Sequence, residues 1–383
     1  MSGFGPEHLP YGVFARPGTA PRVGARLGDD VLDLAALARD GLLEADPALF
    51  AQPALNAFMA AGPETWAAVR ERLVALARGV DARPSLVALD AVQLRLPFGV
   101  ADYVDFYSSL QHATNLGRLL RPGSEPLLPN WRHLPVGYHG RAGTVVVSGT
   151  DVRRPHGQRK PPDAEAPVHG PSTRLDIELE LGVVIGAPSA LGEPVPVARA
   201  LDHVFGLVLV NDWSARDLQA WEYQPLGPFL GKSFATSIGA WVTPLAAVLD
   251  RRVAAPAQAP EPLAYLREEP WALDVALEVE LNGTTVARTN ARQMYWSFAQ
   301  QIAHLTSNGA RLRTGDLLAS GTISGPARGE RGSLIELTWN GTEPLELGDG
   351  GTRTFLQDGD EVVLRGRASD AVTLAEVRGR IVV

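Results

Sequence analysis

The chain has 383 residues, 45% of them apolar and 20% charged, and its 39 glycines and 30 prolines favour a turn-rich, β-rich globular protein with two domains. A net charge of −8 without any basic run argues against a nucleic-acid surface or an anionic membrane as partner. The absence of cysteine excludes disulfides, thiolate metal sites and cysteine nucleophiles.

The first part of the chain predicts a small mixed α/β unit. Residues 11–15 and 22–27 have the composition of short strands. A helix is expected over residues 63–79, where a proline opens the segment, apolar residues recur at helical spacing and a glycine closes it. We place a domain boundary near residue 97, which divides the chain into residues 1–97 and 98–383.

Beyond this boundary the pattern is mostly that of strands. Extended segments are expected at residues 145–148, 175–181, 205–210, 273–281 and 333–339. Asn282-Gly283 and Asn340-Gly341 both tolerate positive φ, so each predicts a tight turn after a strand. Two helices are expected, one after Asp212 and one over residues 297–307.

The first residues lack the charged and apolar regions of a signal peptide. The apolar run at residues 205–210 is too short to cross a bilayer. We therefore expect a cytoplasmic location.

Residues 175–181, Leu-Asp-Ile-Glu-Leu-Glu-Leu, alternate apolar and acidic side chains. In a strand, residues two apart share a face and lie about 7 Å from one another, so Asp176, Glu178 and Glu180 would project together. Such a cluster suits a hard cation. The alternative is a solvated outer face, and this segment alone favours that alternative.

Asp212 strengthens the case for a site, because it follows a buried-strand pattern and lies where such a strand would end. Asp212, Arg216, Gln219 and Tyr223 also have the spacing of one helical face. Arginine, glutamine and tyrosine on one face suit a ligand better than a core. The alternative is that Arg216 only pairs with a neighbouring carboxylate.

A histidine lies near an acid and a tyrosine in residues 102–117. Asp105 and Tyr107 would share one face of an extended segment, and His112 lies about one turn further on. This combination suits acid–base chemistry, although a lone histidine is more often structural.

Lys232 is one of only two lysines among 35 basic residues. An ammonium can supply a point charge, or a proton if its pKa is lowered, whereas guanidinium supplies only the charge. Three residues separate Gly227 from Gly231, where a phosphate-binding loop needs four, so we reject a nucleotide site.

Six uninterrupted segments contain these candidates. They are DYVDFYSSLQHATNLG from Asp102, LLPNWRHLPVGYHGRAGTVVVSGT from Leu127, RLDIELELG from Arg174, VFGLVLVNDWSARDLQAWEYQPLGPFLGKSFATSIG from Val204, GTISGP from Gly321 and SLIELTWNGT from Ser333. Together they resemble the fumarylacetoacetase family, and the likeness covers nearly the whole chain. It implies an α+β, β-rich fold with a small N-terminal SH3-like barrel domain, a larger C-terminal mixed β-roll domain that carries the site, and a homodimer.

The resemblance also implies roles for individual residues. The metal ligands, for Ca²⁺ or Mg²⁺, would be Asp105, Glu178, Glu180 and Asp212. A second cation site would lie around Asp212, Lys232 and Thr236. His112 would be the general base and Glu336 the acid that orients it, while Arg216, Gln219 and Lys232 would stabilise negative charge. The substrate-binding positions would be Tyr107, Arg121, Tyr138, Gln219, Tyr223 and Thr322.

The implied reaction is hydrolysis of the C–C bond of fumarylacetoacetate to fumarate and acetoacetate, the last step of tyrosine and phenylalanine catabolism. A water activated by His112 would attack, and a ligand set of carboxylates alone favours Ca²⁺ or Mg²⁺ over zinc or copper. Two alternatives stay open. One is an acylpyruvate hydrolase or a related diketo-acid hydrolase or decarboxylase of the same superfamily. The other is a non-catalytic calcium-binding module, which leaves His112 and Lys232 unexplained.

Overall fold

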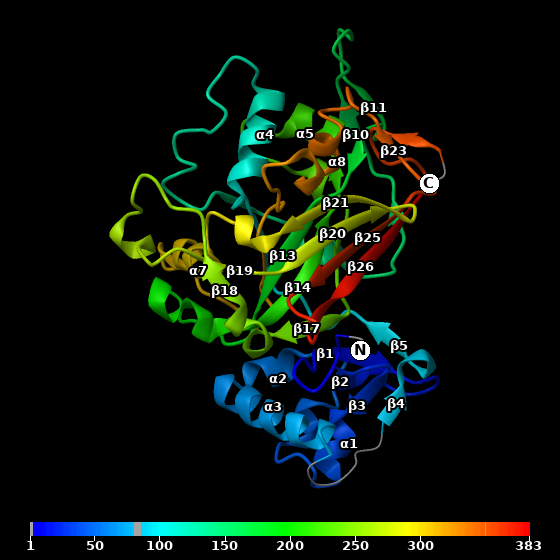
Figure 1. Cartoon of the computed structure of the whole chain (residues 1–383), viewed down its shortest axis with the longest axis vertical. Helices are drawn as coiled ribbons and strands as arrows, with labels where there is room; N and C mark the ends of the chain where they lie inside the picture. Colours follow the sequence, from blue (N-terminus) through cyan, green and yellow to red (C-terminus); the bar gives the residue numbers. More distant parts are fainter. Residues whose placement is uncertain (1–2, 80–85, 349) are drawn as a thin grey trace.

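The computed structural model describes residues 3–79, 86–348 and 350–383 of the chain. Two β-sheets organise these residues (Figure 1). The larger sheet has thirteen strands. Ten form a continuous path in the order β4 (Leu86–Ala88), β3 (Asp30–Asp33), β2 (Arg22–Leu27), β1 (Tyr11–Ala15), β17 (Trp241–Pro244), β14 (Val204–Asp212), β13 (Leu179–Ile185), β22 (Leu317–Ala319), β6 (Tyr103–Phe106) and β7 (Gly137–His139). Three more pair beside this path: β5 (Gln93–Arg95) with β1, β16 (Thr236–Ile238) with β14, and β8 (Val145–Val147) with β16.

The smaller sheet has five strands and packs against the larger one. Its order is β21 (Thr284–Asn290), β20 (Ala276–Leu281), β25 (Glu361–Arg367), β26 (Thr373–Val382) and β9 (Val152–Arg153). Leu209 of β14 and Leu277 and Leu364 of the smaller sheet belong to one buried apolar cluster. This cluster forms the core between the two sheets.

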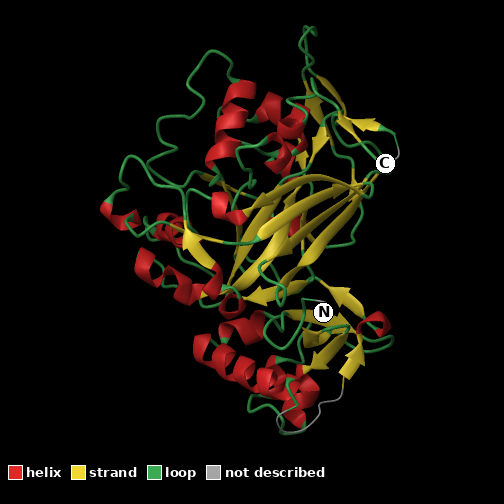
Figure 2. Ribbon diagram, in the orientation of Figure 1, coloured by secondary structure: helices red, strands yellow, loops and turns green. Residues whose placement is uncertain are grey.

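The predicted N-terminal strands and helix are confirmed. Helices α1 (Leu34–Arg39), α2 (Asn56–Ala60) and α3 (Pro63–Ala77) lie on one side of the N-terminal strands (Figure 2). Helix α3 has proline at its first position, which costs no hydrogen bond there, and Gly79 beyond its end has a φ of +67°. Its buried residues, Val69, Leu73 and Leu76, recur at helical spacing.

The N-terminal strands are continuous with the large sheet. Tyr11 of β1 pairs with Val242 of β17, and Phe58 of α2 packs edge-on against Phe205 of β14. The sheet therefore crosses the boundary that we placed near residue 97, and the boundary itself stays a prediction. The pairing confirms a strand-rich mixed α/β fold, while the SH3-like barrel is not confirmed.

The described residues of the C-terminal part contain five further α-helices: α4 (Leu110–Leu120), α5 (Arg216–Glu222), α6 (Leu230–Ser233), α7 (Phe298–Thr306) and α8 (Leu334–Leu337). Four two-stranded ribbons complete it. They are β10 with β11 (His156–Arg159, Val168–Pro171), β12 with β15 (Leu175–Asp176, Ser214–Ala215), β18 with β19 (Arg252–Ala254, Trp271–Leu273) and β23 with β24 (Leu345–Glu346, Thr352–Arg353). None of the described helices combines the length and the apolar character needed to cross a membrane.

Helix α7 confirms the prediction for residues 297–307. The Ser297 side chain accepts the backbone N–H of Gln300, and the Gln300 side chain accepts the backbone N–H of Ser297, which makes a capping box. Gly309, past the end of the helix, has a φ of +87°. The turn at Asn282 and Gly283 is confirmed as well, because both residues have positive φ between β20 and β21.

Residues 175–181 do not form the single strand that their alternating side chains predict. Strand β12 pairs with β15, whereas β13 pairs with β14 and β22. Between them the N–H of Ile177 turns back to the Asp176 carboxylate at 2.7 Å instead of joining a ladder. Asp176, Glu178 and Glu180 are all buried, so the alternative of a solvated face is wrong.

The predicted strand at residues 333–339 is wrong, because the segment contains helix α8. Its first two N–H groups, from Leu334 and Ile335, donate to the buried Asp176 carboxylate at 2.7 and 3.1 Å. This tertiary contact favours a helical turn where the alternating side chains favoured a strand. The turn predicted after it remains, since Asn340 and Gly341 have φ values of +60° and +90°.

Candidate active site

Three acidic side chains meet where strands of the large sheet lie side by side. Asp105 is on β6, Glu180 is on β13, and Glu178 directly precedes β13. Strand β22 pairs with both β6 and β13 and so holds them in register. Each of the three carboxylates offers an oxygen within 4.8 Å of the others, and all three side chains are buried.

Glu178 has positive partners that compensate for its charge. Its carboxylate contacts the Lys232 ammonium, and its Oε1 lies 2.8 Å from Nη2 of Arg216. Burial alone would raise the pKa of Glu178, but Lys232 and Arg216 outweigh burial and hold this pKa well below its ordinary range. Glu178 is therefore a stable carboxylate at neutral pH.

Within the described residues, Asp105 and Glu180 form no ion pair with a basic side chain, and Lys232 lowers their pKa values by less than burial raises them. Asp105 Oδ1 and Glu180 Oε1 are buried without a hydrogen-bond partner. Burial and the neighbouring carboxylates raise the pKa values of both well above the ordinary range. Buried oxygens without partners, in a set made only of carboxylates, fit a hard divalent cation, which would compensate their charge.

Asp212 lies at the end of β14, beside this group and outside the set of three. Its Oδ1 accepts the hydroxyl of Thr236 at 2.7 Å. Its Oδ2 accepts the phenol of Tyr138 at 2.7 Å and Lys232 Nζ at 3.1 Å. The structure thus brings Asp212, Lys232 and Thr236 together, as the resemblance implied. Burial lowers the pKa of Lys232, but Asp212 and Glu178 outweigh burial and raise it, so the ammonium supplies a fixed charge.

His112 forms a buried pair with Glu336. Its Nδ1 lies 2.6 Å from Glu336 Oε2, and its Nε2 lies 4.0 Å from Glu178 Oε1. Burial opposes ionisation of Glu336, but His112 and further hydrogen bonds outweigh it and lower this pKa. Because Glu336 is then a carboxylate, a hydrogen on Nδ1 would donate to it, which leaves Nε2 as the nitrogen that faces Glu178.

The other partners of Glu336 were not predicted from the sequence. Asn115 Nδ2 donates to Oε1 at 2.9 Å, and the hydroxyls of Ser324 and Ser333 donate to Oε2 at 2.9 and 2.7 Å. The spacing of Asn115 to His112, three residues on one helix, was a signal for the first of them. Nothing in the sequence pointed to the two serines, because only the folded chain brings them to Glu336.

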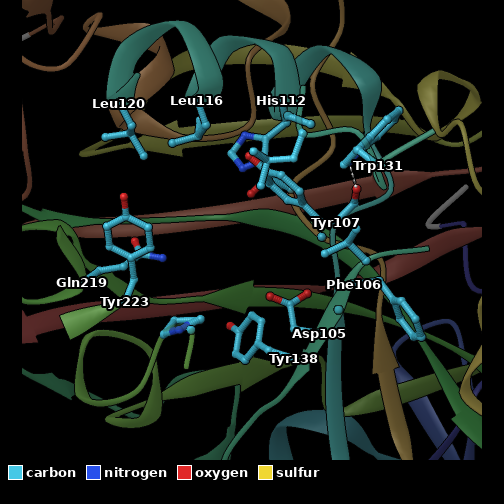
Figure 3. A pocket seen from close by; sticks show the side chains of 18 of the residues that line it. Asp105, Phe106, Tyr107, His112, Leu116, Leu120, Trp131, Tyr138, Gln219 and Tyr223 are labelled. Carbon is cyan, nitrogen blue, oxygen red and sulfur yellow. Dashed lines mark hydrogen bonds between the residues drawn. The ribbon is translucent and has the colours of Figure 1, made fainter. Parts of the chain in front are cut away.

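A cavity of about 420 Å³ connects these groups, which is within the range of small-molecule sites. Figure 3 shows His112, Leu116 and Leu120 along one side of α4, Gln219 and Tyr223 on another wall, and Asp105 and Tyr138 opposite the helix. The lining includes every substrate-binding position that the resemblance implied: Tyr107, Arg121, Tyr138, Gln219, Tyr223 and Thr322. Apolar side chains, among them Leu116, Leu120 and Trp131, thus share the lining of the cavity with the carboxylates and the other polar groups.

Two predictions made from residue spacing alone need correction, although the metal ligands that the resemblance implied did not include Asp176. Asp212 does not belong to the helical face of Arg216 and Gln219, because β14 extends to Asp212 and α5 begins only at Arg216. Asp176 belongs to the same buried region but not to the three-carboxylate set. Arg216 does more than pair with one acid, since its Nη1 also donates to Gln219 Oε1 at 3.1 Å beside the cavity.

Comparison with known proteins agrees with this geometry. The family described as "Fumarylacetoacetate (FAA) hydrolase C-terminal" matches residues 103–382, and "Fumarylacetoacetase N-terminal" matches residues 7–97. The chain belongs to the fumarylacetoacetase family. The human fumarylacetoacetase is 47% identical over 95% of this chain and 92% of its own length, and that of Caenorhabditis elegans is 45% identical over 99% and 96%.

The fold recurs in solved structures of more distant proteins. A fumarylacetoacetate hydrolase from psychrophilic Exiguobacterium antarcticum superposes with a TM-score of 0.60 at 18% identity, over 98% of this chain and 99% of that one. At this identity the likeness concerns the fold alone. Membership of the fumarylacetoacetase family rests on the sequence relatives.

Proposed function

We propose that this enzyme hydrolyses fumarylacetoacetate to fumarate and acetoacetate. The observation that carries the proposal is the buried His112–Glu336 pair at the cavity, with His112 Nε2 4.0 Å from Glu178 Oε1. A hydrolase needs such a base beside an electrophilic centre. The fumarylacetoacetases that align with nearly the whole chain supply the substrate class.

His112 would take a proton from water at Nε2 while Glu336 holds the ring through Nδ1. Glu336 also stabilises the imidazolium that forms, as an acid does for the histidine of a catalytic triad. Water adds to the carbonyl at the scissile bond, and the bond to the acetoacetate fragment then breaks. That fragment takes up one proton on carbon, which His112 can return, so one water is consumed in total.

The negative oxygen formed by this attack needs donors that are already in place. Arg216 and Lys232 line the cavity beside Gln219, and both stay charged, because neighbouring carboxylates raise their pKa values. A donor aimed at such an oxygen contributes about 10²-fold or more to the rate.

Asp105, Glu178 and Glu180 would hold a divalent cation, with Asp212 next to them. When bound, such a cation supplies Lewis-acid polarisation of a substrate carbonyl and offsets the crowded negative charge. We infer Ca²⁺ or Mg²⁺, because every candidate ligand atom is an oxygen. Lys232 and Thr236 would border a second cation next to Asp212.

The test follows the enol absorbance of fumarylacetoacetate with purified protein. A fast loss that a chelator stops and Mg²⁺ or Ca²⁺ restores is the expected result. Absence of turnover in a folded, metal-supplied sample would contradict the proposed substrate. Acylpyruvates, tested in the same assay, examine the nearest alternative, against which the alignment with fumarylacetoacetases counts.

Further properties belong to the same proposal. We infer that residues 1–97 form an SH3-like unit beside the catalytic residues 98–383, and that the enzyme acts as a cytoplasmic homodimer in tyrosine and phenylalanine catabolism. The family relationship supports these inferences. Size-exclusion chromatography with light scattering measures the oligomeric state.

A further inference from the structure

Asp176 is buried next to the catalytic groups, yet the proposed mechanism gives it no role. Its side chain has 0% exposure. A carboxylate has about four hydrogen-bonding positions, and in Asp176 four N–H groups occupy them. Oδ1 accepts the N–H of Ile177 and of Leu334, both at 2.7 Å, and Oδ2 accepts Ile335 N–H at 3.1 Å and Arg216 Nε at 2.8 Å. With both oxygens occupied, Asp176 has no position left for a metal ion.

These four donors belong to two different parts of the site. Arg216 is the first residue of α5, and its other nitrogens contact Glu178 and Gln219. Leu334 and Ile335 are the first residues of α8, directly before Glu336. The Asp176 carboxylate thus connects two groups. One is the Arg216 guanidinium, which would stabilise the developing oxyanion, and the other is helix α8, which carries Glu336, the acid that orients the general base.

Helix α8 depends on such a contact. It has only four residues, and the side chain of Ser333 at its N-terminus makes no capping bond to the helix backbone, because its hydroxyl donates to Glu336 instead. So short a helix is unstable by itself. Asp176 accepts the first two N–H groups, which a cap would otherwise satisfy.

We propose that Asp176 is a positioning residue, whose hydrogen bonds connect the guanidinium of Arg216 to the helix that carries Glu336. This inference rests on the proposed function, because the two groups act together only in that reaction. Loss of these hydrogen bonds displaces both Arg216 and Glu336, and a misplacement of about 1 Å can cost roughly 10²-fold in rate. Since Asp176 does not line the cavity, substrate affinity is not its target.

The first experiment measures fumarylacetoacetate turnover by the metal-supplied Asp176→Asn enzyme. Asparagine has nearly the same shape but offers only one acceptor oxygen. We expect kcat to fall by roughly 10²-fold while KM stays within about threefold. A rise in KM with unchanged kcat would overturn the proposal.

The matched control is Asp217→Asn. Asp217 follows Arg216 on α5 and also accepts four donors: Ser172 Oγ, Thr173 N, Thr173 Oγ1 and Leu218 N. None of them belongs to a catalytic group. We expect kcat within about threefold of the wild type, and a loss as large as that of Asp176→Asn would mean that any weakened α5 contact slows the enzyme.

Double variants separate positioning from general loosening. In an Arg216→Gln or a Glu336→Gln background, Asp176→Asn should cost less than the roughly 10²-fold that it costs alone, because one of the two groups that it positions is already absent. The same 10²-fold loss in kcat in either background would overturn the proposal. If Asp176→Asn does not fold, Arg216→Gln alone breaks the same connection from its other end, and unchanged hydrogen exchange of residues 333–340 in that variant would overturn the proposal.

Hydrogen exchange provides a readout that needs no turnover. In Asp176→Asn the amides of residues 333–340 should exchange faster, and in Asp217→Asn they should not. If the wild type did not hydrolyse fumarylacetoacetate, the proposed function would fail while this measurement still tested the contact. If the amides of residues 333–340 exchanged no faster in Asp176→Asn than in Asp217→Asn, the inference itself would be overturned.

Discussion

Burial decides the chemistry of each carboxylate in this cavity, because a buried acid keeps its charge only when cations or N–H groups lie against it. Glu178 has Lys232 and Arg216, and Glu336 has His112 and three further donors. Asp105 and Glu180 each have a buried oxygen without a partner. Similar side chains therefore serve as a permanent anion, an orienting acid and candidate cation ligands.

His112→Ala should abolish hydrolysis. The loss in kcat should be at least about 10³-fold, within the range of a general base. Metal content should stay near that of the wild type, because the metal candidates are untouched, whereas thermal stability should fall, because Glu336 loses a buried partner. His156→Ala, on the exposed β10–β11 ribbon, is the control and should retain full activity. An active His112→Ala enzyme would exclude the histidine-base mechanism.

Glu180→Gln should stabilise the chelator-treated protein at pH 8. Burial, Asp105 and Glu178 raise the pKa of Glu180, so the folded protein keeps a proton that the unfolded chain releases at the ordinary pKa. The stability from this group is present at low pH and is lost as the pH rises through the folded value. Glutamine removes that loss, and we expect Tm to rise by about 2–4 °C at pH 8 and less at pH 5.

The metal-supplied protein is the control for that prediction. With a cation bound, Glu180→Gln should lower Tm instead, because it removes a charged ligand. Scanning calorimetry of both variants at the two pH values, with and without chelator, measures all of these differences. A lower Tm for Glu180→Gln at pH 8 with chelator present would show that the carboxylate is not under electrostatic strain.

At the scale of elements, two short helices place the basic side chains of Lys232 and Arg216 next to the carboxylates. Helix α6 carries Lys232 and packs closely on α5, which carries Arg216. Gly231 permits this approach, because a Cβ there would lie 2.8 Å from the backbone nitrogen of Gln219 and 3.0 Å from the carbonyl oxygen of Ala215. Both of these atoms are backbone, so one helix would have to move.

Gly231→Ala should therefore separate α6 from α5. We expect a loss of about 1–3 kcal/mol in the free energy of unfolding, as for other overpacked positions. Activity should fall roughly tenfold, because Lys232 moves with α6. Gly143→Ala is the control, since a Cβ there meets nothing within 4 Å. Urea unfolding and steady-state kinetics measure both effects, and wild-type values for Gly231→Ala would contradict the argument.

For the whole molecule, the continuous sheet couples the N-terminal strands to the catalytic part. Strand β1 pairs with β17, which pairs with β14, the strand that ends at Asp212. Apolar residues from both sides of residue 97, among them Tyr11, Phe58, Phe205 and Val210, belong to one core cluster. Stability of the two parts should therefore be shared.

Calorimetry should show one cooperative unfolding transition for the full chain. Expression of residues 98–383 alone should give poorly soluble protein, because the edge of β17 and the apolar side chains around Phe205 become exposed. Two resolved transitions, or a soluble and active fragment, would show that the N-terminal unit is energetically independent.

The sequence by itself determined the elements whose side chains and turns follow local rules, such as helix α3 between Pro63 and Gly79. It also determined the family, and through it the chemical types at the site, from segments that contain Asp105, His112 and Glu178. Local patterns are sufficient here, because backbone preferences and the period of buried side chains depend on neighbours in the chain.

Only the tertiary structure decided where the buried acids lie and what each of them binds. Alternation at residues 175–181 and 333–339 predicted two strands, but the contact of Asp176 with the first N–H groups of α8 interrupts one and replaces the other. That contact joins residues 158 positions apart. A pattern of neighbouring residues does not contain it, because the free energy of a buried carboxylate depends on the donors that the fold brings to it.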